Sequence, residues 1–267
     1  MASGNSFGSD SDLFITVSKK KAGKAKKLHY INSDHQEAIP VDQSLRNILR
    51  AKIEIESSVF YHTFLSALQS ILDKSKKDLS EITCLGLGRI SSCRTAQYQL
   101  GLILLLQEHF LCATEVYDPV FSASEKVIIS ELKLKVSEHN CEGKIISNST
   151  GFTLFVFPHC PKELSNNLLW VNWKQSHLAN CILYGNSFEK IHLDTPHRFL
   201  KSYEFLIKSL EVVREISVPN VFHVTDIFND LSLHYFPENL IAQIPSSFWE
   251  AVEPDYPEES ELVKDVS

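Results

Sequence analysis

The segment Cys84-Leu85-Gly86-Leu87-Gly88-Arg89 ends a short apolar run and carries two glycines one residue apart. Residues 91–110 then have the apolar spacing of a helix, and a second apolar run ends at Tyr117-Asp118-Pro119. A strand, a glycine turn, a helix, a strand and an acidic residue, in this order, open a Rossmann-like α/β unit. Such a unit holds a nucleotide-like ligand at the ends of its strands.

The chain beyond this segment continues to alternate between short apolar strands and helices. We expect strands at 82–86, 113–117, 134–137, 153–157 and 181–184, and a final hairpin of strands 221–224 and 231–235. We expect helices at 91–110, 122–132, 162–173 and 195–213, with Ser91 and Ser122 as caps and Pro161 near a helix start. The predicted fold class is α/β, with a Rossmann-like, methyltransferase-like doubly wound and mostly parallel sheet.

The sequence predicts four parts along the chain. Residues 1–40 are expected to be a disordered basic leader, 41–78 a helical extension, 79–236 the Rossmann-type domain and 237–267 an acidic tail. Apolar residues recur every three or four positions from Leu45 to Leu72, which indicates one long helix or two helices broken near Ser57-Ser58. From Glu250 onward the chain is acidic and contains two prolines, so we expect this end to be unfolded.

Composition is that of a soluble protein from a reducing compartment. The chain has 267 residues, 43% of them hydrophobic, which is enough for one sizeable core. Its six cysteines form no Cys-x-x-Cys pair, and we expect no metal site. No signal segment opens the sequence, and the apolar run Leu100–Leu106 is far shorter than the roughly 18 residues of a membrane span. We expect a cytoplasmic protein without membrane contact.

Positive charge is concentrated near the N-terminus. Six lysines lie between Lys19 and Lys27, and without them the net charge of −7 becomes −13. An acidic folded part repels a phosphate backbone, so nucleic-acid binding by the folded domain is disfavoured. The lysine run has three interpretations: a solvated leader, a nuclear-import signal or a weak RNA-binding tail.

Polar residues gather where the predicted strands end. Gly86, Gly88 and Arg89 follow the first strand and Asp118 the second, while His159 and Cys160 follow the fourth and Asn186 the fifth. The carboxyl ends of parallel strands meet at one edge of a sheet, and this edge forms the ligand crevice. The sequence therefore predicts a binding site there. Catalytic residues remain unassigned, because the chain contains no P-loop and no Ser-His-Asp pattern.

The glycine turn supports two interpretations. Gly86 and Gly88 permit close backbone approach to an anionic group before a helix N-terminus. The dinucleotide pattern, however, has a third glycine where Ser91 stands, and the S-adenosylmethionine pattern has an acid where Cys84 stands. Asp118 can accept hydrogen bonds from a ribose, but Asp-Pro is also a common turn. The turn either binds a ligand or is purely structural.

His159-Cys160-Pro161 offers an imidazole and a thiol at the same edge. A Cys-Pro pair can present a thiolate to haem iron, and histidine is another axial ligand. Haem is therefore a possible ligand, with His159 and Cys160 as candidate axial residues. The alternative is that both residues are structural.

Several short motifs resemble those of the SRR-like family, named for "sensitivity to red light reduced". They run in order from about residue 80 to 190 and comprise Cys84-Leu-Gly-Leu-Gly, Gln97-Tyr-Gln-Leu, Tyr117-Asp-Pro-Val-Phe121, Phe157-Pro-His-Cys160, Asn166-Asn-Leu-Leu-Trp-Val-Asn-Trp173 and Tyr184-Gly-Asn-Ser-Phe188. The resemblance implies a regulatory protein associated with circadian-clock input, gene expression and haem biosynthesis. It implies no established enzyme activity.

Two classes of function remain after the sequence is read. The first is a regulatory protein that acts by binding haem or a nucleotide-like ligand, with protein partners that the sequence does not identify. The second is a transferase that uses S-adenosylmethionine or a nucleotide over Gly86, Gly88 and Asp118. The first is favoured because the glycine pattern is incomplete and the resemblance brings regulation rather than a reaction.

Overall fold

A seven-stranded sheet forms the centre of the computed structural model, which describes residues 39–258 and 260–264. Its order is β3-β2-β1-β4-β5-β7-β6. The strands are β1 (Leu79–Leu85), β2 (Ala113–Tyr117), β3 (Lys135–Val136), β4 (Phe152–Phe157), β5 (Cys181–Asn186), β6 (Arg214–Ser217) and β7 (Leu231–Tyr235). The first five are parallel, and β7 runs antiparallel to both β5 and β6. The predicted fold class is confirmed, with the switch point between β1 and β4.

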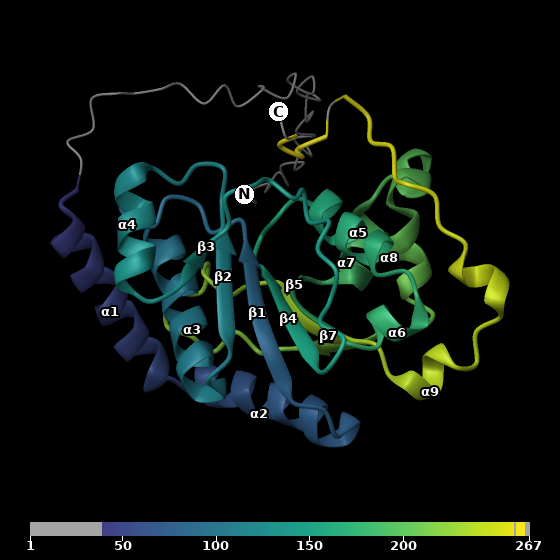
Figure 1. Cartoon of the computed structure of the whole chain (residues 1–267), viewed down its shortest axis with the longest axis horizontal. Helices are drawn as coiled ribbons and strands as arrows, with labels where there is room; N and C mark the ends of the chain where they lie inside the picture. The colour runs from purple at the N-terminus through teal and green to yellow at the C-terminus, as the bar shows by residue number, and fades with distance from the viewer. Residues whose placement is uncertain (1–38, 259, 265–267) are drawn as a thin grey trace, which may run out of the picture. The chain divides into compact units, whose positions relative to one another are not determined.

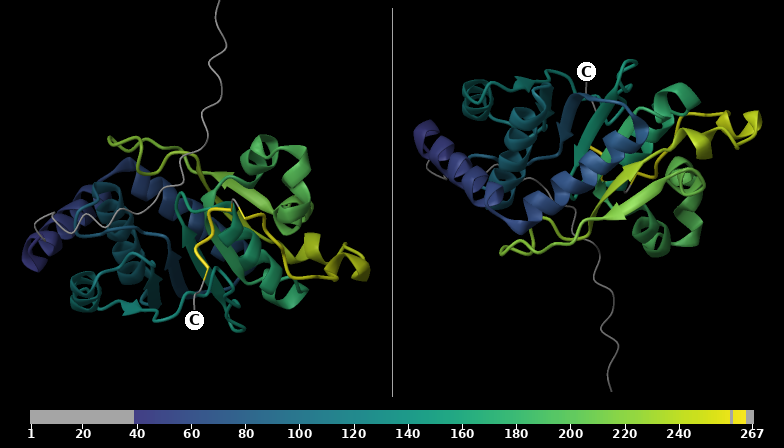
Figure 2. Two further views of the ribbon diagram at one scale, coloured as in Figure 1. Left: turned by 90° about the horizontal axis from the view of Figure 1, so that it is seen from above. Right: turned by 90° about the horizontal axis from the view of Figure 1, so that it is seen from below.

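Helices cover both faces of the sheet (Figures 1 and 2). One face carries α1 (Val41–Glu56), α2 (Val59–Ser75), α3 (Arg94–Phe110) and α4 (Ala123–Glu131). The other carries α5 (Lys162–Val171), α6 (Gln175–Leu178), α7 (Phe188–Asp194), η1 (His197–Tyr203) and α8 (Glu204–Ser209). Because both faces are covered, every residue of β4 is buried, as expected for a central parallel strand.

The N-terminal helices belong to the same core as the sheet. The apolar periodicity from Leu45 to Leu72 corresponds to two helices rather than one long helix, and the break lies at Ser57-Ser58, as the second alternative predicted. The Ser58 hydroxyl accepts a hydrogen bond from the Tyr61 amide at 3.2 Å and so caps α2. Phe60 and Phe64 of α2 are fully buried. The expected leader lies outside the described residues, except for its last two positions.

Three local predictions were wrong. The predicted strand 221–224 is a loop, and the partner of β7 is β6 instead. The predicted helix 195–213 is instead η1 followed by the short α8. It starts after Pro196 and not at Thr195, because proline disfavours helical conformation in the residue before it. Ser91 does not cap a helix, since α3 begins after Cys93.

The C-terminal part is ordered against the domain in residues 237–258 and 260–264, which differs from the expectation of an unfolded end. It contains α9 (Glu238–Ile241) and η2 (Ser246–Trp249), and the following segment runs past the helices of the second face, in yellow in Figure 1. The indole of Trp173 donates a hydrogen bond to the Phe248 carbonyl at 2.9 Å, so η2 is anchored just beyond the end of α5.

Candidate functional site

Asp118 ties the glycine turn to the end of β2. One of its carboxylate oxygens accepts a hydrogen bond from the Gly88 amide at 2.7 Å, and the other accepts from the Val120 amide at 2.9 Å. Burial raises the pKa of Asp118, although the two amide hydrogen bonds oppose this effect. Each oxygen keeps a second lone pair, so the carboxylate can hold the turn and still accept a bond from a ligand.

The two glycines of the turn have different surroundings. Both have positive φ, +74° at Gly86 and +76° at Gly88, which favours glycine at each position. A Cβ atom on Gly86 would lie 2.3 Å from the Cys160 sulfur, whereas a Cβ on Gly88 would meet nothing within 4 Å. Gly86 is therefore a packing position, and Gly88 faces open space.

Cys160 packs beneath the turn with only 6% of its surface exposed. Its thiol donates a hydrogen bond to the Leu85 carbonyl at 3.3 Å. Burial, and after it the charge of Asp118, raises the pKa of the Cys160 thiol. The thiol is therefore protonated at neutral pH, and as it stands it does not fit a thiolate ligand for haem iron.

His159 fits an axial ligand better than its neighbour. Its side chain is exposed, its backbone has φ of +55°, and its Nε2 lies 3.2 Å from the Ile227 carbonyl. The same carbonyl accepts a bond from Gln99 of α3, so the loop between β6 and β7 crosses toward the edge of the sheet. His159 would have to release Ile227 before its Nε2 could bind iron.

The structure brings the predicted site residues to one edge. Leu85 of β1 pairs with Tyr117 of β2, and the Asn186 amide at the end of β5 donates to the Cys160 carbonyl at 2.9 Å. Asn186 thus supports the turn that follows β4. The glycine turn, Asp118, His159, Cys160 and Asn186 all lie at the carboxyl ends of neighbouring strands.

Glu125 is a residue of this edge that the sequence analysis missed. It is completely buried and accepts four hydrogen bonds, from the amides and hydroxyls of Ser91 and Ser122, at 2.9–3.0 Å. Burial raises the pKa of Glu125, but the bonds from Ser122 and Ser91 outweigh it and lower the pKa overall. The Ser122-x-x-Glu125 spacing is that of a capping box and could have been recognised in the sequence. The hydrogen bonds from Ser91 could not, because they join residues 34 positions apart.

The sequence analysis also missed His234 and Glu215, which lie next to each other under α7. His234 is fully buried, and its Nε2 lies 3.4 Å from a carboxylate oxygen of Glu215 on the neighbouring strand. Burial opposes ionisation of Glu215, yet the interaction with His234 lowers the pKa of Glu215 to about 2. The pairing depends on the register of β6 against β7, so no local sequence signal marks it.

A separate hollow lies away from this edge. It measures about 950 Å³ and is lined by residues near the starts of β1 and β5, among them Lys77, Asn180 and Trp249. This is the opposite edge from the glycine turn. Within the described ranges, no group of three or more His, Cys, Asp or Glu side chains is arranged to hold a metal ion. No helix within those ranges is long and apolar enough to cross a membrane.

The sheet order and the glycine turn at its carboxyl edge define a Rossmann-like, methyltransferase-like α/β fold. The chain belongs to the SRR1 family, because the SRR1 domain matches residues 45–235. Membership of this family indicates a regulatory protein in general terms, without a specific role.

Relatives from animals and a plant cover most of the chain. An SRR1-like protein of Drosophila melanogaster is 34% identical over 212 residues, which is 79% of this chain and 75% of that protein. The Arabidopsis thaliana protein SENSITIVITY TO RED LIGHT REDUCED 1 is 29% identical over 227 residues, or 78% and 81% of the two chains. A solved geranyl diphosphate C-methyltransferase from Streptomyces coelicolor is 8% identical and covers 66% of this chain and 79% of its own, with a TM-score of 0.35. A likeness this low carries no argument about ligand or reaction.

Proposed function

We propose that the chain is a regulatory protein that binds a nucleotide-like ligand over Gly88. Through this binding it takes part in the regulation of haem biosynthesis and of circadian-clock gene expression. The open space over Gly88, beside the buried carboxylate of Asp118, carries the proposal. The name of the Arabidopsis relative, which refers to red light, is in keeping with a role in light or clock input.

The start of α3 adds a second argument for an anionic ligand group. Its N-cap residue, Cys93, makes no side-chain capping hydrogen bond. The first amides of the 17-residue helix can therefore donate hydrogen bonds to a phosphate or carboxylate of a ligand. Asp118 would accept from a ribose hydroxyl with a remaining lone pair while it keeps the turn in place.

Gly88→Val is expected to weaken ligand binding strongly in the folded protein. A branched side chain fills the space over the turn, and calorimetric titration with ADP, NAD and S-adenosylmethionine should show saturable binding of at least one of them to the wild type. Binding of that ligand should weaken at least tenfold in the variant, which corresponds to about 1.4 kcal/mol. Asp118→Ala should weaken it by about 1–3 kcal/mol, since a charge-assisted hydrogen bond is lost.

The matched control is Lys133→Val, which places the same side chain at a positive φ of +59° in an exposed turn before β3. It carries similar backbone strain, and its affinity should equal that of the wild type. Unchanged affinity in both Gly88→Val and Asp118→Ala would place the ligand elsewhere. Absence of binding in the wild type for the whole panel would contradict the nucleotide-like ligand.

Haem is a second candidate because the exposed ring of His159 stands at the same edge. Titration of the wild type with ferric haem should give one-to-one binding and a Soret band typical of histidine ligation. His159→Ala should shift that band and weaken binding at least tenfold. Cys160→Ala should leave the band unchanged, because the Cys160 thiol is buried and protonated.

The outcome separates the two residues. A Soret band that moves with Cys160→Ala instead would mean that the turn opens and exposes a thiolate. Haem binding that neither substitution alters would remove this pair from the site and leave only nonspecific adsorption to apolar surface.

A further inference from the structure

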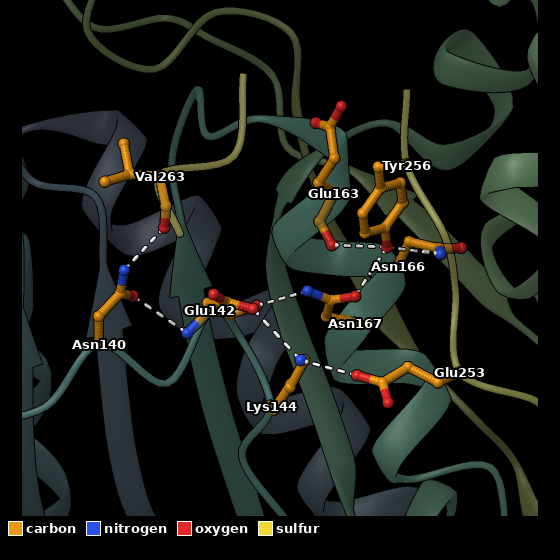
Figure 3. Close-up of polar contacts among 9 residues, drawn as sticks. All are labelled: Asn140, Glu142, Lys144, Glu163, Asn166, Asn167, Glu253, Tyr256 and Val263. Atoms are coloured by element: carbon orange, nitrogen blue, oxygen red, sulfur yellow. Dashed lines mark hydrogen bonds and ion pairs between the residues drawn. The ribbon is translucent and has the colours of Figure 1, made fainter. Parts of the chain in front are cut away.

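The C-terminal segment, residues 250–258 and 260–264, docks on α5 through one tyrosine (Figure 3). The Tyr256 hydroxyl accepts a hydrogen bond from the Asn166 amide at 2.8 Å and donates to the Asn167 amide oxygen at 2.7 Å. The Glu163 carbonyl oxygen lies 3.3 Å away on the preceding turn of the helix. Two side chains and one backbone carbonyl of α5 thus surround a single hydroxyl.

The two asparagines are held in place by the domain itself. The Asn166 oxygen accepts bonds from the amides of Phe205 and Leu206 at 3.1 Å each. The Asn167 amide donates to the Glu142 carbonyl at 2.8 Å. Each side chain therefore has one end fixed inside the domain and presents its other end to Tyr256. Both asparagines are at most 1% exposed. Loss of Tyr256 leaves the Asn167 oxygen without its donor, while the Asn166 amide keeps only a longer bond, 3.4 Å, to the Ser202 carbonyl.

The ring of Tyr256 has its own contact surface. It stacks on Tyr203, with the ring centroids 5.8 Å apart and the planes at 30°. Tyr203 is itself fixed, because its hydroxyl donates to the Glu163 carboxylate at 2.8 Å. The site therefore recognises an aromatic ring and a hydroxyl together, and this combination selects tyrosine.

The surrounding charge favours a neutral hydroxyl. Burial, followed by the nearby carboxylates of Glu163, Glu142 and Glu253, raises the pKa of Tyr256, although the bond from Asn166 opposes this effect. A phosphate on Tyr256 would add up to two negative charges among these groups. We therefore expect the site to exclude phosphotyrosine.

The rest of the segment is held by exposed contacts. Lys144 pairs with Glu253 at 2.8 Å, and the Asn140 amide donates to the Val263 carbonyl at 2.7 Å, both at the surface. Exposed ion pairs contribute little to stability, so Tyr256 is the main anchor of this stretch. The asparagines and Tyr203 lie inside residues 45–235, which match the SRR1 domain, whereas the docked segment lies outside them.

We propose that the surface formed by Glu163, Asn166 and Asn167 of α5 and Tyr203 of η1 is a docking site for an acidic, tyrosine-bearing segment of a partner protein. The chain's own segment Glu253-Pro254-Asp255-Tyr256-Pro257 occupies this site in cis. A partner segment that carries an unphosphorylated tyrosine displaces it. This site is separate from the crevice over Gly88, so either proposal can fail without the other.

The test uses a fluorescein-labelled peptide of residues 250–264 and full-length protein. In the wild type the tethered segment has a high effective concentration, so the peptide should bind poorly. Tyr256→Ala in the full chain empties the site, and the peptide should then bind one-to-one and at least tenfold more tightly, measured by fluorescence anisotropy. Asp255→Ala is the matched control: its side chain is exposed, the anchor stays in place, and binding should be as poor as in the wild type.

Changes in the peptide test recognition without altering the fold of the receptor. On the Tyr256→Ala chain, a peptide with phenylalanine at 256 should bind about 10- to 100-fold more weakly, because the buried Asn167 oxygen loses its donor and the Asn166 amide loses the shorter of its two bonds. A phosphotyrosine peptide should show no binding. If the original peptide does not bind the Tyr256→Ala chain, or the phenylalanine or phosphotyrosine peptide binds as tightly as the original, the proposal is overturned.

Discussion

Gly86→Ala should lower the free energy of unfolding by about 2–5 kcal/mol. Two effects add at this position. Its φ of +74° lies in the left-handed region, where a Cβ atom costs about 1–2 kcal/mol. The new Cβ would also lie 2.3 Å from the Cys160 sulfur, and overpacking of a close-packed site costs about 1–3 kcal/mol. Urea denaturation monitored by circular dichroism measures the change.

Two companion variants separate the two effects. Gly88→Ala has nearly the same φ, +76°, and its Cβ would meet nothing within 4 Å, so it reports the backbone strain alone. Cys160→Ala removes the sulfur, and combined with Gly86→Ala it should recover about 1–3 kcal/mol relative to the sum of the single changes. Strictly additive single and double variants would contradict the packing of Cys160 on Gly86.

The sequence predicted the frame of this site well because the frame depends on local patterns. Each parallel strand is a short apolar run, and strands of this kind buried on both faces lose the alternation of exposed sheets. The glycine turn and Asp118 mark the ends of β1 and β2, which the fold rules place at one edge. In the structure, the glycine turn and Asp118 lie together at that edge.

The errors occur where a distant contact overrides the local pattern. The stretch 221–224 has the composition of a strand, but Phe222 packs against the rings of Phe60 and Tyr98 and holds the stretch as a loop. The true strand, β6, is a polar edge strand of four residues, and it takes its place from pairing with β7. Such pairings are between residues far apart in the chain.

The chemical environment of the candidate residues could not be predicted from the sequence either. Cys160 follows a strand and precedes Pro161, which is compatible with an exposed thiolate. Whether such a thiol is buried depends on the neighbouring turn, and here the missing side chain of Gly86 makes room for it. The docking of Tyr256 on α5 joins residues about 90 positions apart and has no local signature.

Glu125→Ala is expected to destabilise the protein by about 3–4 kcal/mol. Four donors, the amides and hydroxyls of Ser91 and Ser122, lose their acceptor, and a buried donor left unpaired costs about 1–3 kcal/mol before water or rearrangement relieves part of it. The hydrogen bonds that Glu125 accepts from Ser91 join α4 to the turn between β1 and α3. The variant should therefore also weaken any ligand held over Gly88, as thermal shift and calorimetry would show.

Glu125→Gln tests the charge rather than the contact. Because the folded protein lowers the pKa of Glu125, its carboxylate contributes stability that is fully present above the usual glutamate pKa of about 4.3. That contribution declines as the pH falls below this value and through the lower pKa of the folded state. The wild type should lose stability over this acidic range, and Glu125→Gln should lose less while being less stable at pH 7.

Glu131→Gln supplies the comparison, since Glu131 ends the same helix and its side chain is exposed. Removal of the Glu131 charge should leave unchanged both the free energy of unfolding at neutral pH and the rate at which it falls with decreasing pH. If Glu125→Gln retains the full acid slope of the wild type, the carboxylate is not the ionised centre of this network. The ordering of the β1–α3 turn would then rest on Asp118, which is the other buried carboxyl that binds it.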